Sequence, residues 1–256
     1  MMNGYLSGFI LGLIQGLTEF LPVSSSGHLL LVEKLGVGEP NLFTNLALHF
    51  ATLLSVVIVM RKQLWEIITH PLSDRTKFLA VATVPTGIIA ALIRYFLPET
   101  GEYLPFFFVC TGVILLIPRI VGEKEVVQEC TYRDKLVLRA LFVGSMQGIA
   151  CFNGISRSGT TTSALNLCGF DAKRSAEDSF LLSIPIIVAS ALVELLTGGA
   201  KNIKIGEILI GSITAFLVGI AAIKIFFKAI KKDKLWLFAF YAFFAAIASS
   251  VLFFYR

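Results

Sequence analysis

Two stretches of the chain carry the same thirteen-residue pattern, and this repeat constrains the fold more than any other feature. The first reads QGLTEFLPVSSSG from Gln15 to Gly27, and the second reads QGIACFNGISRSG from Gln147 to Gly159. Both contain Gln-Gly, a Phe five residues after the Gln, and an apolar-Ser-x-Ser-Gly ending. A repeat at this separation predicts two copies of one structural unit. Because both copies carry polar side chains within apolar sequence, we expect the chemistry where the two halves meet.

The composition is that of an integral membrane protein. Hydrophobic residues make up 56% of the chain and the mean hydropathy is +0.81, whereas the apolar fraction of soluble domains is roughly 45–50%. Six apolar segments have about the 17–25 residues that cross a bilayer as helix. We predict an all-α, polytopic membrane protein with spanning helices at 43–60, 78–97, 104–120, 179–197, 205–227 and 235–255.

The shift that places Gln15 on Gln147 also superposes the first three spanning segments on the last three. We therefore expect a single membrane domain, 1–256, with repeat 1 at about 1–121 and repeat 2 at about 133–256. The segments beside the motifs are too short or too broken to span a bilayer, and re-entrant helical hairpins explain them more simply: 5–19 with 25–35, and 136–151 with 157–168. Irregular backbone at membrane depth must be buried in protein or line a wet cavity. The tips of the two hairpins should then meet inside the membrane.

The number of crossings predicts inverted topology. A hairpin plus three crossings places the start of the second repeat on the opposite side of the membrane. One set of loops holds fifteen Lys and Arg residues, while the other holds five: Lys34, Arg94, Lys201, Lys204 and Arg256. Because cytoplasmic loops carry the excess of Lys and Arg, both termini and the mouth of the first hairpin should face outward. The net charge of +5 lies in short loops, which does not indicate nucleic-acid binding.

The first motif gathers ionisable and hydroxyl side chains at membrane depth: Glu19, Ser24, Ser25, Ser26 and His28. Serine alone commonly packs membrane helices. Ionisable groups at this depth, in contrast, usually face a bundle interior or a water-filled cavity and mark a functional site. Glu19 is a candidate ligand for a divalent cation, and a serine with a histidine nearby supplies nucleophile or acid/base candidates.

The second motif indicates a phosphate site. Arg157 offers planar, bidentate donors that suit phosphate or carboxylate, although a structural pair with Glu19 is the alternative, since buried charges are usually paired. Small polar residues surround Arg157 at an expected helix start, where free N–H groups attract anions: Ser156, Ser158, Gly159, Thr160 and Thr161. Together the motifs suggest hydrolysis of a phosphoric anhydride at a membrane surface.

Two strings, EFLPVSSSGH from Glu19 to His28 and GISRSGTT from Gly154 to Thr161, identify a resemblance over essentially the whole chain. The chain resembles the undecaprenyl-diphosphate phosphatases of the bacitracin-resistance type. The resemblance implies removal of the terminal phosphate of a C55 polyprenyl diphosphate at the outer face of the cytoplasmic membrane. It also implies recycling of the lipid carrier for cell-wall peptidoglycan synthesis, with an effect on bacitracin sensitivity.

The resemblance also implies roles for individual residues. Glu19, Ser25, His28 and Arg157 correspond to catalytic positions, and Glu19 with Gln15 corresponds to a site for Mg²⁺ or Ca²⁺. Gln15 stands where many members have an acidic residue, and Asn153 replaces a usual proline. The remaining motif residues are expected to bind substrate phosphate: Ser24, Ser26, Gly27, Ser156, Ser158, Gly159, Thr160 and Thr161.

Several alternatives stay open from the sequence. Either Ser25 or His28 can be the nucleophile, with Ser25 preferred, and a homodimer is compatible with the sequence. A polyprenyl-phosphate transporter or flippase shares the inverted-repeat architecture. Lipid phosphatases of the acid-phosphatase type need a histidine after Arg157, and the three histidines, His28, His49 and His70, all precede it. We expect His49 and His70 to make structural polar contacts or lie in a loop rather than join the site.

Overall fold

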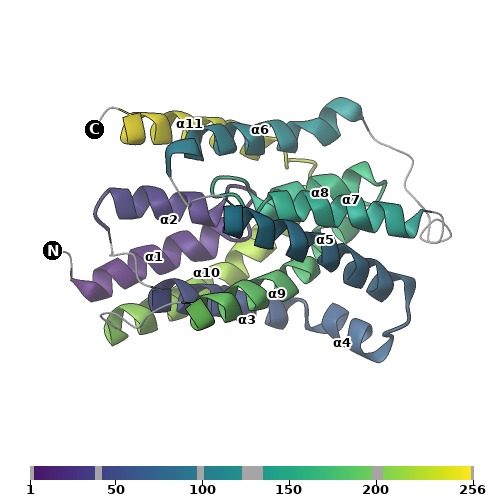
Figure 1. The fold of residues 1–256 in the computed structure, drawn as a ribbon, viewed down its shortest axis with the longest axis horizontal. Coiled ribbons are helices and arrows are strands. Elements are labelled where there is room, and N and C mark those ends of the chain that lie inside the picture. Colours follow the sequence, from purple (N-terminus) through teal and green to yellow (C-terminus); the bar gives the residue numbers. More distant parts are fainter. Residues whose placement is uncertain (1–2, 38–41, 97–100, 123–134, 198–203, 255–256) are drawn as a thin grey trace.

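The computed structural model describes residues 3–37, 42–96, 101–122, 135–197 and 204–254, and within these ranges the chain is helical and contains no strand (Figure 1). The elements are α1 (Gly4–Thr18), α2 (Ser25–Lys34), α3 (Leu42–Val59), α4 (Arg61–Thr69), α5 (Asp74–Phe96), η1 (Gly101–Tyr103), α6 (Leu104–Val121), α7 (Leu136–Ile149), α8 (Arg157–Leu167), α9 (Ala172–Thr197), α10 (Ile205–Lys231) and α11 (Leu237–Phe254).

The multi-pass membrane architecture is confirmed. Five helices are long and apolar enough to cross a bilayer: α5, α6, α9, α10 and α11. The sixth predicted span, 43–60, corresponds to α3, which continues into α4 after a bend of 75° at Met60. The chain thus has five spanning helices within its described part, or six if α3 and α4 count as one broken span. The polar start of α4, Arg61-Lys62-Gln63, explains why the apolar segment ends here.

Two short hairpins, α1–α2 and α7–α8, enter from opposite ends of the molecule and bring their tips together near its centre (Figure 1). Each second helix begins with a serine cap: Ser24 Oγ accepts the Gly27 N–H at 3.4 Å, and Ser156 Oγ accepts the Gly159 N–H at 3.2 Å. Ser24 has a φ of 70°, an uncommon value for a residue with a side chain. Its Oγ also accepts the Gly154 N–H at 3.1 Å. The unusual backbone of Ser24 therefore serves to join the first tip to the second.

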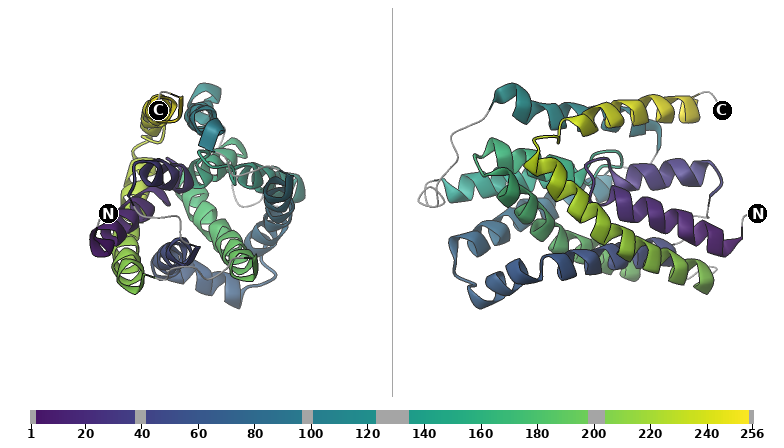
Figure 2. Two further views of the ribbon diagram at one scale, coloured as in Figure 1. Left: turned by 60° about the vertical axis from the view of Figure 1, so that its left-hand side comes forward. Right: turned by 180° about the vertical axis from the view of Figure 1, so that it is seen from behind.

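The helices of the first half have counterparts in the second half at the same spacing as the two motifs. The shift that places Gln15 on Gln147 relates α1 to α7, α2 to α8, α3 with α4 to α9, α5 to α10, and α6 to α11. Packing exchanges partners between the two halves: α1 lies against α10, and its counterpart α7 lies against α5 (Figure 2). Gly12 on α1 and Gly144 on α7 allow these approaches, because they face the backbone carbonyls of Gly211 and Ala82. The first hairpin is therefore held by a long helix of the second half, and the second hairpin by a long helix of the first.

A cluster of buried aromatic rings packs against the tip of the first hairpin. Phe180 on α9 lies at the centre, with its ring centroid 5.7 Å from that of Phe20 in the first tip and 5.1 Å from that of Phe226 on α10. All three side chains are no more than 2% exposed. Aromatic edge contacts of this kind add to the burial of apolar surface. The irregular backbone after Glu19 is thus fixed against a rigid core.

Candidate active site

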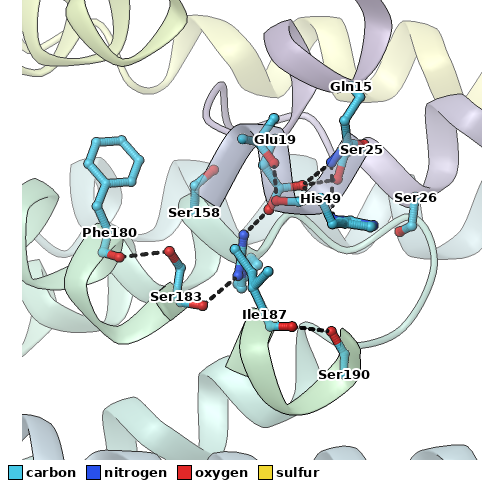
Figure 3. Close-up of polar contacts among 12 residues, drawn as sticks. Gln15, Glu19, Ser25, Ser26, His49, Ser158, Phe180, Ser183, Ile187 and Ser190 are labelled. Atoms are coloured by element: carbon cyan, nitrogen blue, oxygen red, sulfur yellow. Dashed lines mark hydrogen bonds and ion pairs between the residues drawn. The ribbon is translucent and has the colours of Figure 1, made fainter. Parts of the chain in front are cut away.

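Glu19 is the centre of a polar cluster at the tip of the first hairpin. The residue follows the last turn of α1 and is only 6% exposed. Its Oε1 forms an ion pair with Arg157 Nη2. Its Oε2 accepts hydrogen bonds from Ser25 Oγ at 2.6 Å and from Gln15 Nε2 at 3.1 Å (Figure 3). The buried carboxylate therefore has a positive partner and two neutral donors, as a buried charge requires.

Arg157 is the first residue of α8 and bridges the two hairpins and α9. Besides its ion pair with Glu19, its Nη1 donates to the carbonyl oxygen of Ser183 on α9 at 3.3 Å. The predicted meeting of the two motifs is confirmed by this pair and by the bond from Gly154 to Ser24. A guanidinium has five N–H donors, so these two contacts leave others to bind an anion.

Ser25 and His28 have different surroundings. Ser25 Oγ lies against Glu19, whereas the His28 ring faces α11. His28 Nδ1 donates to the Ser24 carbonyl at 2.7 Å, which leaves Nε2, 2.8 Å from the Tyr241 hydroxyl, as an acceptor. The ring also stacks on Tyr241, with centroids 5.6 Å apart. The structure thus brings Ser25 to a carboxylate rather than to the histidine.

His49 makes the polar contact that the sequence predicted, and the structure places this contact within the cluster rather than apart from it. From α3, its Nδ1 lies 3.1 Å from Gln15 Nε2 and 3.9 Å from Glu19 Oε2. The sequence contained an indication of this position, because His49 is an ionisable residue within an apolar span. Burying such a residue in a membrane costs free energy unless it faces the interior of the bundle or a cavity. His70, in contrast, is exposed at the end of α4 with Thr69 as a partner, in agreement with the expected loop position.

A cavity of about 680 Å³ opens over the cluster. Of the predicted site residues, those lining it are Glu19, Ser24, Ser25, Ser26, Ser156 and Arg157. Further polar or charged groups come from Glu33, Asn45, His49, Arg94, Asn153 and Ser190, and the rest of the wall is largely apolar. A large apolar cavity with a few convergent polar groups is the usual form of a site for a small molecule or a lipid head group.

The other predicted phosphate-binding residues support the tips from behind. Gly27 packs against Phe108, and Gly159 packs against Pro22, so neither faces the cavity. Ser158 Oγ donates to the Leu21 carbonyl at 3.3 Å. Thr161 Oγ1 donates to Gln147 Oε1 at 3.3 Å, while Thr160 Oγ1 is buried with no partner in the described structure. These residues hold the helix start in place without lining the cavity.

The donors for a cation are few. Within the described residues, no group of three or more His, Cys, Asp and Glu side chains could hold a metal ion. Glu19 contributes one carboxylate, and Gln15 Oε1 beside it is a buried oxygen to which no described residue donates a hydrogen bond. Mg²⁺ commonly takes one or two carboxylates and completes its shell with water and substrate phosphates. Because Gln15 does not line the cavity, a cation beside Glu19 would need most of its ligands from water or a bound phosphate group.

Fold and site together define a multi-pass helical membrane protein in which a serine, a carboxylate and an arginine converge on a cavity between two hairpins. The family described as bacitracin resistance protein BacA matches residues 8–248, and the chain belongs to this family.

Curated relatives match over nearly their full length. The undecaprenyl-diphosphatase of Halothermothrix orenii is 38% identical, with 94% of this chain and 95% of the relative aligned. The undecaprenyl-diphosphatase of Thermosipho melanesiensis is 39% identical, with 95% and 97% aligned. The undecaprenyl-diphosphatase of Carboxydothermus hydrogenoformans is 35% identical, with 98% of both chains aligned.

Proposed function

We propose that this protein is an undecaprenyl-diphosphatase, which hydrolyses a polyprenyl diphosphate to the polyprenyl phosphate and inorganic phosphate. The observation that carries the proposal is the contact of Ser25 with Glu19 directly beside Arg157, on the wall of a largely apolar cavity. The names of the aligned relatives support the same activity.

Ser25 is the nucleophile and Glu19 is its general base in this proposal. The distance of 2.6 Å between Ser25 Oγ and Glu19 Oε2 is within the hydrogen-bond reach that proton transfer needs. Ser25 Oγ bonds to the terminal phosphorus while its proton passes to Glu19. The bridging P–O bond breaks, and polyprenyl phosphate leaves with the electron pair. Water then hydrolyses the phosphoserine and releases inorganic phosphate.

Arg157 and the start of α8 stabilise the phosphoryl oxygens. The positively charged guanidinium directs its remaining N–H groups towards the phosphoryl oxygens, which gain negative charge in the transition state. The α8 N-terminus adds its positive dipole end. His28 holds the Ser24 carbonyl at the start of α2, which favours a positioning role over that of nucleophile.

A divalent cation, Mg²⁺ or Ca²⁺, is part of the proposal. Glu19 and the unpartnered Gln15 Oε1 are the protein groups that would hold it together with diphosphate oxygens. When bound, such a cation neutralises charge on the leaving phosphate.

We further propose that the two halves have inverted topology in the cytoplasmic membrane and that the cavity opens to the outer side. The opposed hairpins and the excess of Lys and Arg in one set of loops support this orientation. Lys124, Arg133, Lys201 and Arg256, which contribute to that charge difference, lie outside the described residues. The cavity reaches Glu33 near the end of α2, on the side of the two termini (Figure 1). Substrate generated outside would reach Ser25 from this side.

The alternative is a transporter of polyprenyl phosphate, since opposed broken helices meeting at mid-depth are typical of carriers. Transport requires an anion site but no nucleophile and base. The contact between Ser25 and Glu19 therefore favours hydrolysis.

The deciding experiment is phosphate release from undecaprenyl diphosphate by the detergent-purified protein, with and without Mg²⁺, beside the Ser25→Ala variant. We expect release by the natural protein and a loss of roughly 10⁴-fold or more in the variant, as for other serine nucleophiles. Absence of release from the folded natural protein would favour the transporter.

A further inference from the structure

Two glycines at equivalent positions of the two halves have opposite surroundings. Gly87 on α5 and Gly219 on α10 are related by the same shift that places Gln15 on Gln147. A Cβ on Gly219 would lie 2.8 Å from Ser55 Oγ on α3 and 2.9 Å from the ring of Phe20, so close helix packing requires glycine there. A Cβ on Gly87 would meet no heavy atom within 4 Å beyond its chain neighbours and the backbone of its own helix turn, among the described residues. Glycine weakens a helix interior relative to alanine, and packing gives no reason for it at Gly87.

The helix partners differ in the same way. Ser55 on α3 donates to the Phe216 carbonyl of α10 at 2.8 Å and ties these two helices together. The residue equivalent to Ser55 is Ile187 on α9, and it lines the cavity together with Gly87. The repeat thus relates two pairs of helices that pack differently. In the first pair, α3 packs directly against α10. In the second pair, the cavity separates α5 from α9.

Buried charged side chains hold α5 and α9 together at one end. Arg75 on α5 contacts Asp178 of α9 at 2.7 Å and Glu177 at 3.3 Å, and Arg75 and Asp178 are at most 7% exposed. Towards the other end, the cavity lies between the two helices. We call this part of the cavity the α5–α9 slot. Its apolar walls include Gly87, Ala90, Ala91, Ile186, Ile187 and Val193, and Arg94 and Ser190 add polar groups.

The slot continues directly from the anion site. Arg157 Nη1 donates to the carbonyl of Ser183, which lies one turn before Ile187 on α9 (Figure 3), and Arg157 and Ile187 both line the cavity. Phe107 and Phe152, whose rings stack with centroids 4.6 Å apart, also line the cavity. Apolar and aromatic walls of this kind suit a hydrocarbon.

We propose that the α5–α9 slot binds the first isoprene units of the substrate and that Gly87 sets its width. The proposal rests on the proposed function and names the place of the lipid chain in that site. The volume of about 680 Å³ falls within the roughly 300–1,000 Å³ of sites for drug-sized ligands. It therefore accommodates a diphosphate with the first part of a chain, and the rest of a C55 chain lies in the bilayer. The small residues at 87, 90 and 91 leave room for methyl branches.

The test narrows the slot and compares substrates with and without a chain. In Gly87→Leu, the ratio of kcat/KM for undecaprenyl diphosphate to kcat/KM for methyl diphosphate should fall at least tenfold, mainly through KM of the long substrate. Ala90→Leu, one turn along the same wall, should lower the ratio in the same direction. Ala80→Leu is the matched control, because Ala80 is an exposed residue of α5 that does not line the cavity, and its ratio should stay at the natural value.

An unchanged ratio in both slot variants, or an equal loss for both substrates, would overturn the slot proposal. A measurement of ligand affinity distinguishes failure of the slot proposal from failure of the proposed phosphatase function. If the natural protein releases no phosphate, the Kd of undecaprenyl phosphate relative to methyl phosphate decides: a tenfold weakening of the long ligand alone by Gly87→Leu supports the slot, and an unchanged Kd excludes it.

Discussion

Ser25 Oγ lies 2.6 Å from Glu19 Oε2, although the two residues are separated by the irregular tip of the first hairpin. The same carboxylate forms the ion pair with Arg157, which enters from the second hairpin. One side chain therefore connects the Ser25 hydroxyl of one motif with the Arg157 guanidinium of the other. The proposed catalytic site thus needs residues from both halves of the chain.

The role of Glu19 as base predicts a loss of turnover that depends on Ser25. Glu19→Gln keeps the size of the side chain but removes its charge, so kcat should fall by about 10²–10⁴-fold. Because both residues act in the same proton transfer, the loss in the double variant Ser25→Ala/Glu19→Gln should be smaller than the product of the two single losses. Phosphate release under saturating substrate measures this, and multiplicative losses would contradict a shared step.

Arg157 should contribute both to binding and to the transition state. Arg157→Ala is expected to lower kcat by about 10²–10³-fold, as for the loss of one oxyanion donor, and to weaken the binding of undecaprenyl phosphate. Arg157→Lys retains the charge but not the planar donors, so it should recover only part of the activity. Phosphate release and ligand titration measure the two effects separately.

The matched control for Arg157 is Arg119→Ala, which removes an exposed arginine that pairs with Asp233 and does not line the cavity. Its activity should be that of the natural protein. Near-normal turnover in Arg157→Ala would exclude the proposed anion site.

Gln15 should affect how tightly the site binds the cation. Gln15→Glu places a second carboxylate beside Glu19, and two carboxylates hold Mg²⁺ more tightly than one. We expect the Mg²⁺ concentration for half-maximal phosphate release to fall about tenfold, in line with the effect of added ligand charge. Titration of activity with Mg²⁺ measures the change. An unchanged titration would remove Gln15 from the cation site.

The buried charges between α5 and α9 should stabilise the fold. Removing one partner of a buried ion pair leaves the other uncompensated, so Arg75→Ala should lower the free energy of unfolding by about 3–5 kcal/mol. Arg119→Ala, which breaks an exposed pair, should change it by about 0–1 kcal/mol. Denaturant unfolding in detergent measures both. Equal effects of the two variants would contradict the view that the buried ion pairs of Arg75 stabilise the contact between α5 and α9.

The class of fold and the two charged residues at the hairpin tips follow from the amino-acid sequence, whereas their pairing with each other was only the alternative to phosphate binding by Arg157. Apolar length predicted the spanning helices, because a bilayer imposes about 20 residues on each crossing. The repeated motif predicted two broken hairpins whose tips meet, since irregular backbone and charges at membrane depth must be satisfied inside the protein. Glu19 and Arg157 follow from this argument without any knowledge of the packing.

The side chains that join this pair depend on how the helices pack. His49 reaches Gln15 from α3, and His28 turns towards Tyr241 on α11, because helix packing sets the direction of each ring. Composition also cannot distinguish Gly87 from Gly219: one faces a cavity and the other a closed helix contact. Periodicity and hydropathy are local properties of the chain, whereas these contacts depend on how helices from the two repeats cross, and only the assembled fold specifies that.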